Sequence, residues 1–422
     1  MGAFPVESQD LLSPELTADP YEYFATLRRH DPVHWNEPAK GWLHTRYADI
    51  SDAMFDPRLS SNRALPLLDS MTPERRDVMA PMLQTISRWM VVNDPPVHTR
   101  LRKLSNAAFR QQRVVAMGEW IAEMVDDLLD DFIASGQTDL FSGFANQLPA
   151  MTIARMLGAP DEDLPKIHEW SEELGLVAFG GGGEARPDRH SRALVGIREM
   201  EQYLHVLIEK VRREPGQDMI SVLVHDQSGD SDDRLTDDEI AAMSALILLA
   251  GHETTTNLLT NAVVTLTRHP EQLDLLVSSP ELVKGAVEEV LRYEGPVKVL
   301  TRWVTEDHER GGRTIKKGER VLLVQPSGNR DAEMFPDGDV FDIQRPTQPL
   351  HLGFGRGIHA CIGAQLARLE ARVALPKLLE RLPGLAVVGD VDWAPSFASR
   401  GVKELPISYH GMRATVTSGG RG

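Results

Sequence analysis

The stretch HLGFGRGIHACIG, residues 351–363, holds Cys361, the only cysteine in a chain of 422 residues. A lone cysteine excludes an intramolecular disulfide and any zinc or iron–sulfur site that needs several cysteines. The glycines around it let the backbone turn tightly and approach a flat partner. Apolar residues at helical spacing follow Gly363, so Cys361 should lie just before a helix N-terminus. That position favours a thiolate, which is a nucleophile or a metal ligand; the alternative is an inert, buried cysteine.

Length and composition predict one large globular unit. Hydrophobic residues make up 41% of the chain, enough for a sizeable core, and no linker, internal repeat or low-complexity run divides residues 1–422. The N-terminal stretch MGAFPVESQDLLSPEL resembles neither a signal peptide nor a membrane span, so we expect a soluble, cytoplasmic protein. The net charge of −17 argues against nucleic acid and anionic membranes as partners.

A long helix is predicted from the capping box TDDE, residues 236–239, to Arg268. It would be about 45 Å long at 1.5 Å per residue, and it is apolar on all sides, as in a helix that crosses a core. The polar run HETTTN, residues 252–257, interrupts it at a cost in free energy unless these groups are hydrogen-bonded or functional. Steps of three and four place one set of side chains on a common face: Met243, Ile247, Ala250 and Thr254. The Thr254 hydroxyl either faces a bound molecule or bonds the carbonyl four residues earlier.

Two shorter patterns place charged groups at helical spacing. His98 and Arg102 lie four residues apart, just after two prolines that suit the first turn of a helix. Such a pair suits a carboxylate or a phosphate, and a solvated helix face is the alternative. Glu289 and Arg292 lie three residues apart, which permits an ion pair on one helix face.

Together these motifs resemble those of the cytochrome P450 family, in order and over nearly the whole chain. The stretch from Phe354 to Gly363 fits F-G-x-G-x-H-x-C-x-G, and residues 250–254 fit A-G-x-E-T. Residues 289–292 fit E-x-x-R, and residues 94–102 fit D-P-P-x-H-x-x-x-R. The resemblance implies a mainly α fold with a smaller β-rich part, in a single catalytic domain over residues 1–422 with no fused reductase. The missing membrane span points to the soluble, bacterial-type branch of the family.

The resemblance also implies a cofactor, heme b (iron protoporphyrin IX), with Cys361 as the axial thiolate ligand of the metal. His98 and Arg102 would hold one heme propionate, and Arg302 would reach the second. Further residues expected to contact the cofactor are Ala250, Gly251, Phe354, Gly355, His359 and Gly363. By the same resemblance, Glu253 and Thr254 would be the catalytic residues that supply protons during oxygen activation.

Glu289 and Arg292 would form a structural ion pair in this family. The chain has Val340 at a position that is often basic, so Arg345 is the expected third member of that network.

The family's cavity walls predict a set of residues that line the substrate site. These residues are Met90, Val91, Met243, Ile247, Val297, Val299 and Phe397. Val297 and Val299 would face either substrate or core, and Lys298 would point into solvent unless it turns inward. Residues 60–92 would form a loop that caps the cavity. The glycine-rich residues 177–188 would be a lid over the substrate channel or a surface insert.

The implied function is that of a monooxygenase that uses O2 to hydroxylate or epoxidise a largely apolar small molecule, in secondary metabolism or catabolism. Because no flavin or iron–sulfur domain is fused to the chain, a separate ferredoxin and its reductase would supply the electrons. Two alternatives stay open. One is a heme-thiolate enzyme with another outcome, such as oxidative coupling, peroxygenation or nitration, and the other is a non-catalytic heme sensor or carrier. Glu253 and Thr254 favour the dioxygen route.

Overall fold

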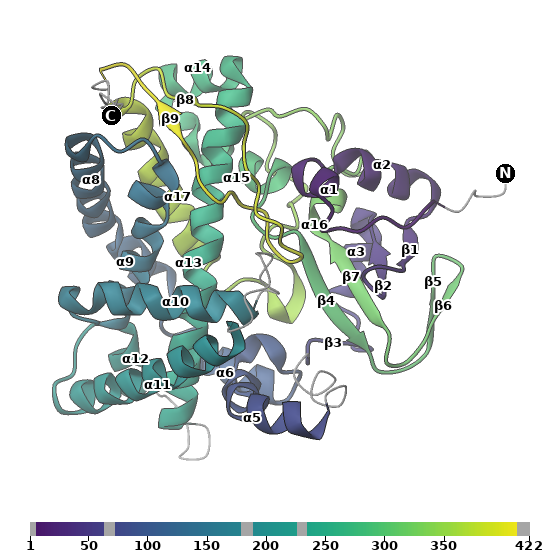
Figure 1. Cartoon of the computed structure of the whole chain (residues 1–422), viewed down its shortest axis with the longest axis horizontal. Coiled ribbons are helices and arrows are strands. Elements are labelled where there is room, and N and C mark those ends of the chain that lie inside the picture. The colour runs from purple at the N-terminus through teal and green to yellow at the C-terminus, as the bar shows by residue number, and fades with distance from the viewer. Residues whose placement is uncertain (1–5, 63–71, 179–188, 226–233, 412–422) are drawn as a thin grey trace, which may run out of the picture.

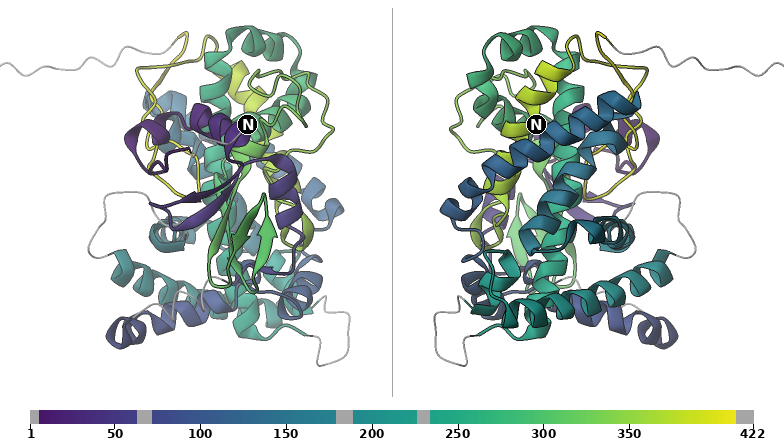
Figure 2. Two further views of the ribbon diagram at one scale, coloured as in Figure 1. Left: turned by 90° about the vertical axis from the view of Figure 1, so that its right-hand side faces the viewer. Right: turned by 90° about the vertical axis from the view of Figure 1, so that its left-hand side faces the viewer.

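The computed structural model describes residues 6–62, 72–178, 189–225 and 234–411. Helices dominate, and most of them gather on one side of the molecule, whereas strands β1 to β7 and helices α1 to α3 lie on the other (Figure 1). In the left view of Figure 2 the strands of the main sheet face the viewer, and in the right view the helices do. The predicted mainly α fold with a smaller β-rich part is confirmed.

The N-terminal half holds α1 (Pro14–Ala18), α2 (Tyr21–His30), α3 (Tyr47–Ala53), α5 (Pro73–Ser87), α6 (Val97–Ser105), α7 (Gln111–Ala116), α8 (Gly118–Ser135), α9 (Gln147–Leu157), α10 (Leu164–Ala178) and α11 (Arg189–Arg213). The C-terminal half holds α12 (Met219–His225), α13 (Asp237–Arg268), α14 (Pro270–Ser278), α15 (Val283–Tyr293), α16 (Gln325–Gly328) and α17 (Ala364–Arg381). Single turns are η1 (Met90–Val92), η2 (Phe141–Ala145), η3 (Asp161–Asp163), η5 (Pro280–Leu282) and η6 (Gly357–His359). The strands are β1 (Val33–Asn36), β2 (Gly41–His44), β3 (Leu59–Ser60), β4 (Val299–Val304), β5 (His308–Arg310), β6 (Arg313–Ile315), β7 (Arg320–Val324), β8 (Ala386–Val387) and β9 (Ile407–Ser408).

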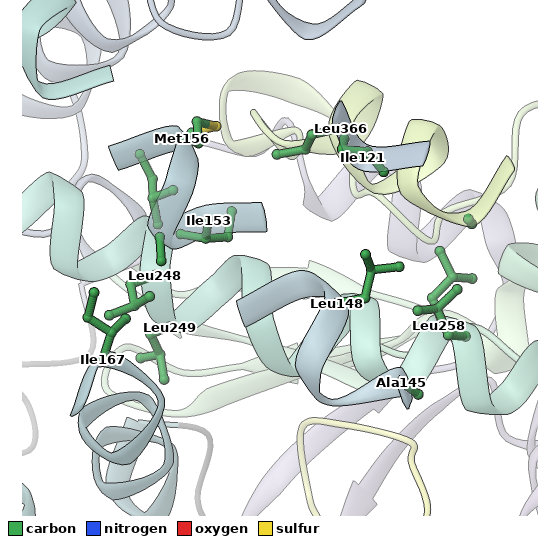
Figure 3. Close-up of a cluster of buried hydrophobic side chains, with 14 of the residues drawn as sticks. Ile121, Ala145, Leu148, Ile153, Met156, Ile167, Leu248, Leu249, Leu258 and Leu366 are labelled. Atoms are coloured by element: carbon green, nitrogen blue, oxygen red, sulfur yellow. The ribbon is translucent and has the colours of Figure 1, made fainter. Parts of the chain in front are cut away.

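Helix α13 begins and ends where the sequence predicts. Thr236 and Glu239 complete the capping box, each side chain bonding the other residue's backbone amide. Most of its side chains are buried, and the buried apolar ones belong to one large hydrophobic cluster. Figure 3 shows part of this cluster, with Ile153 of α9, Leu248 of α13 and Leu366 of α17 among the labelled side chains. The long helix therefore runs through the core and supports the elements around it.

The main sheet has the order β1-β2-β7-β4-β3, with β2 and β7 parallel and the other neighbours antiparallel. Strands β1 and β2 are antiparallel neighbours along the chain and form a hairpin. An irregularity stands at the start of β4, where the amides of Lys298 and Val299 both donate to the Ala398 carbonyl, over 2.8 and 3.3 Å. Two residues opposite one make a β-bulge, which changes which side chains share a face of the strand.

The Cys361 loop leads directly into α17, as predicted. Two of its glycines, Gly355 and Gly357, have positive φ of 66° and 70°. At Gly357 a Cβ atom would also lie only 2.7 Å from the Met54 carbonyl oxygen, so a side chain does not fit there. The Cys361 amide donates to the Phe354 carbonyl over 2.8 Å, which closes the loop.

Two segments were predicted to cover the cavity, residues 60–92 as a loop and residues 177–188 as a lid or a surface insert. Residues 60–92 were expected to form a loop, but α5 occupies Pro73–Ser87, so that prediction was wrong for its middle part. Of the proposed lid, residues 179–188 lie outside the described residues. Within the part of the chain that the structure describes, no helix is both long and apolar enough to span a bilayer.

Candidate active site

A cavity of about 240 Å³ lies between α13, the Cys361 loop and α17. The predicted wall residues that border it are Met90, Val91, Met243, Ile247 and Val297. The predicted cofactor contacts that border it are His98, Arg102, Ala250, Gly251, Phe354, Gly355, His359, Cys361 and Gly363. Further side chains around it were not predicted: Phe109, Ile153, Leu246, Leu258, Leu291, Leu300, Gln325, Leu366 and Glu370. The cavity is therefore apolar over most of its wall, with a few polar groups near the cysteine.

Protein surrounds the Cys361 side chain, but the side chain keeps accessible surface because it faces the cavity. Burial raises the pKa of its thiol, while the amides of Gly363 and Ala364 and the charge of Arg102 lower it by less. The amides at the helix N-terminus favour the thiolate, as expected, but burial outweighs them, so they do not by themselves hold a thiolate. A metal ion bound to the sulfur would do so, because coordination deprotonates a thiol.

His98 and Arg102 face the cavity from α6, on the helix face that the sequence predicts. His98 is buried, at 2% exposure, and neither Nδ1 nor Nε2 has a hydrogen-bond partner among the residues that the structure describes. Its ring centroid lies 4.2 Å from that of His359. Arg102 Nη1 donates to the Ala360 carbonyl, next to the cysteine, over 2.7 Å. Buried imidazole nitrogens beside a guanidinium fit an acidic group held in the cavity.

Thr254 and Glu253 take different directions from α13. Thr254 borders the cavity, and its hydroxyl donates to the Ala250 carbonyl over 2.7 Å, which is the alternative that the sequence left open. Glu253 does not border the cavity. Burial raises the pKa of Glu253, and the Ser399 hydrogen bond opposes this shift.

Besides Glu253, three residues predicted to contact the cofactor or the substrate do not border the cavity. Because of the bulge, Leu300 and not Val299 follows Val297 on the cavity side, and Val299 packs in a separate core cluster. Phe397 also packs against that cluster, so neither residue borders this cavity, and for Val299 this is the core alternative that the sequence left open. Arg302 lies two residues beyond Leu300 in β4, and its Nη1 donates to the Thr301 carbonyl over 3.0 Å. Its role toward a propionate stays a prediction.

Lys298 points inward, contrary to the favoured orientation. It is 4% exposed, and Nζ lies 3.4 Å from the Leu11 carbonyl oxygen. Burial and the charge of Arg400 lower the pKa of Lys298 to about 8. Lys298 does not border the cavity, so it is no anchor for a substrate there.

The Glu289–Arg292 pair lies away from the cavity and is almost fully buried. Arg292 makes two bonds of 2.7 Å to the carboxylate of Glu289, and it also donates to the backbone carbonyls of Asn329, Gly338 and Val340. Arg345 Nε bonds the same carboxylate over 3.2 Å, as predicted. The network ties α15 to the irregular segment before the cysteine loop.

Glu370 is the ionisable cavity residue that the sequence analysis missed. It lies on α17, 1% exposed, and burial raises the pKa of its carboxyl to about 8. The nearby Thr152 lowers this pKa slightly, yet Glu370 Oε2 and Thr152 Oγ1 each lack a hydrogen-bond partner of normal geometry. The spacing of Leu366, Glu370 and Ala374 on one buried face could have revealed it, because a charge interrupts an apolar stripe.

Comparison with known proteins places the chain in a family. The family model described as Cytochrome P450 matches residues 67–278 and 274–383. The chain is 38% identical to the cytochrome P450 monooxygenase PikC of Streptomyces venezuelae, covering 96% of this chain and 94% of the relative. It is 39% identical to the vitamin D(3) 25-hydroxylase of Pseudonocardia autotrophica, covering 95% and 96%.

Two solved structures agree with this. The crystal structure of CalO2 has a TM-score of 0.86 at 30% identity, covering 96% of this chain and 99% of that one. The structure of P450BioI in complex with a fatty acid-ligated acyl carrier protein has a TM-score of 0.84 at 36% identity, covering 94% and 100%. The protein therefore belongs to the cytochrome P450 family and is a monooxygenase of that family, whose members carry heme iron and use O2 and small-molecule substrates.

Proposed function

We propose that the protein uses O2 to hydroxylate or epoxidise a largely apolar small molecule in secondary metabolism or catabolism. The observation that carries this proposal is the apolar cavity into which the only cysteine points. Among the described residues, the ionisable side chains on the cavity wall are those of His98, Arg102, His359, Cys361 and Glu370. A substrate with a charged group would find no dedicated partner among them, so shape and apolar contact would orient it.

The residues present fit heme b. Cys361 would bind its iron, and the unpaired nitrogens of His98, with Arg102 beside them, would receive a propionate. Arg302 would reach the second propionate. Gly251 faces the cavity from α13 and adds no side chain to it, which leaves room above a flat ring. The heme would supply oxygen activation, with the thiolate donating electron density toward O–O cleavage.

The chain's own groups would then exclude water and manage protons. The apolar side chains of Leu246, Ile247 and Leu300 would hold the substrate in a dry part of the cavity. Thr254 donates its proton to a backbone carbonyl, so its oxygen is open to accept a hydrogen bond from the cavity. Glu253, one residue earlier, would provide the acid that renews protons there.

Electrons would come from a separate ferredoxin and its NAD(P)H-dependent reductase in the cytoplasm. Relatives named for vitamin D hydroxylation and polyketide biosynthesis, and one solved with a fatty acid-ligated carrier protein, share the fold. We therefore propose a class of substrate, a neutral and mostly apolar molecule.

The test is the absorption spectrum of the purified, reduced protein under carbon monoxide, for wild type and Cys361→His. A strongly red-shifted Soret band in wild type that is lost in the variant would support thiolate ligation. Substrates would then be screened by the shift in spin state on binding. A protein without heme, or a band that the substitution leaves unchanged, would contradict the proposal.

A further inference from the structure

Two adjacent glutamates of α15 bind different partners. Glu289 belongs to the buried network with Arg292. Glu288 instead accepts hydrogen bonds from Nε and Nη2 of Arg368, on α17, over 2.7 and 2.8 Å. This bidentate geometry is the strong form of an arginine–carboxylate pair. Arg372, four residues further along the same face of α17, adds a bond of 3.2 Å, so Glu288 is the acid at the centre of a cluster of cations.

A histidine connects this cluster to the backbone of the cysteine loop. The Gly353 amide donates to His351 Nδ1 over 3.0 Å, so the ring carries its proton on Nε2. That nitrogen donates to Glu288 Oε2 over 3.2 Å. Burial raises the pKa of Glu288, but the bonds from His351 and Arg368 outweigh burial and bring this pKa down to about 2. Glu288 is therefore a carboxylate at neutral pH.

Arg368 approaches the cysteine across an aromatic ring. Its guanidinium carbon lies 4.4 Å from the centre of the Phe354 ring, and Phe354 borders the cavity together with Cys361. The Phe354 carbonyl accepts the Cys361 amide over 2.8 Å, which ties the two residues to each other. Burial raises the pKa of the Cys361 thiol, and the charge of Arg368 is among the causes that lower it. The guanidinium is thus close enough for its charge to act on the cysteine.

Water screens this ion pair only in part. The side chains of Glu288 and Arg368 are 14% and 17% exposed, and charges this far from solvent keep much of their interaction. Because the carboxylate binds the guanidinium in two places, it cancels part of the positive charge that the cysteine experiences. Arg102, the other cation beside Cys361, bonds the Ala360 carbonyl instead of a carboxylate. Glu288 is therefore the group that can moderate the charge of Arg368.

We propose that Glu288 is a positioning residue that sets the reduction potential of the cysteine-bound heme iron, by holding Arg368 against Phe354 and cancelling part of its charge. This rests on the proposed function. Reduction takes one electron from the ferredoxin, which is oxidised, and converts ferric to ferrous iron, so the site gains one negative charge. A cation beside the cysteine favours that gain, and a cation paired with a carboxylate favours it less.

A purely structural role for the pair would be to fasten α15 to α17. Both roles predict a less stable protein when either partner is replaced, so stability does not distinguish them. The sign of the charge does, because Glu288→Gln removes a negative charge and Arg368→Gln removes a positive one. A structural defect would move the potential in the same direction in both variants, whereas the electrostatic role moves it in opposite directions.

The measurement is the reduction potential of the heme-loaded protein, followed by its absorption spectrum. Glu288→Gln should favour the ferrous state about tenfold, a rise of about 59 mV for one electron, because it leaves Arg368 uncompensated. Arg368→Gln should lower the potential, and Arg368→Lys, which keeps the charge, should lower it less. The double variant Glu288→Gln/Arg368→Gln carries neither charge and should return toward the wild-type potential.

A second readout on the same samples is the C–O stretching frequency of the reduced protein under carbon monoxide. It should rise in Glu288→Gln and fall in Arg368→Gln, because a positive charge draws electron density away from the bound carbon monoxide. Asp126→Asn is the matched control. It removes an ion pair of 2.7 and 2.9 Å with Lys377, on the same helix α17 but near its other end, and should leave both readouts unchanged.

Two results would overturn the inference. One is a potential that Glu288→Gln and Arg368→Gln shift in the same direction, and the other is a shift in Glu288→Gln no larger than that in Asp126→Asn. In either case a red-shifted carbon monoxide band in wild type would leave the proposed function standing. A wild-type protein without that band would refute thiolate ligation itself, and the inference would fail with it.

Discussion

Glu370 allows a stability prediction whose size follows from the structure. Its carboxyl has a pKa of about 8 in the folded protein against a usual 4.5, so the folded state keeps a proton that the unfolded chain releases. Between these two values, stability falls with rising pH by about 1.4 kcal/mol per pH unit, and the total is roughly 5 kcal/mol. Below pH 4.5 both states are protonated, and above pH 8 both are ionised, so this contribution stops changing. Glu370→Gln cannot ionise and should remove that decline.

The measurement is the free energy of unfolding in denaturant, at a series of pH values, for heme-loaded wild type and variant. The curves of wild type and Glu370→Gln should diverge steadily from pH 4.5 to 8, with the variant more stable at the alkaline end. Glu380→Gln is the control, because Glu380 is exposed on the same helix and its replacement should leave the wild-type slope unchanged. Parallel curves for wild type and Glu370→Gln would refute the argument that burial keeps this carboxyl neutral.

Two further outcomes are expected. Arg292→Ala leaves the Glu289 carboxylate buried without its main partner and should cost about 3–5 kcal/mol, seen as a lower denaturation midpoint. Arg345→Ala, which leaves every bond of Arg292 in place, should cost clearly less, and equal losses would contradict this ranking. Thr254→Ala should divert electrons to hydrogen peroxide, whereas Thr256→Ala, whose hydroxyl makes the same backbone bond outside the cavity, should not. Peroxide-driven turnover that survives Thr254→Ala would instead favour a peroxygenase.

The sequence predicted best where structure depends on neighbours along the chain. The capping box at Thr236 and Glu239 is local, and so are the helical faces that bring Thr254 to the cavity and pair Glu289 with Arg292. Each of these depends on residues three or four apart, a distance that one helical turn fixes. The same reasoning placed His98 and Arg102 together on the cavity wall.

The errors come from contacts between distant segments. Strand alternation puts Val297 and Val299 on one face, but the carbonyl of Ala398 accepts two successive amides and moves Leu300 to the cavity instead. Nothing between residues 297 and 304 encodes that bulge, because its cause lies about a hundred positions later in the chain. The same C-terminal segment pairs Ser399 with Val297 and donates the Arg400 amide to the Pro296 carbonyl, so one loop determines which residues at the start of β4 line the wall. A change in this loop should therefore alter substrate fit, although neither Ala398 nor Ser399 borders the cavity.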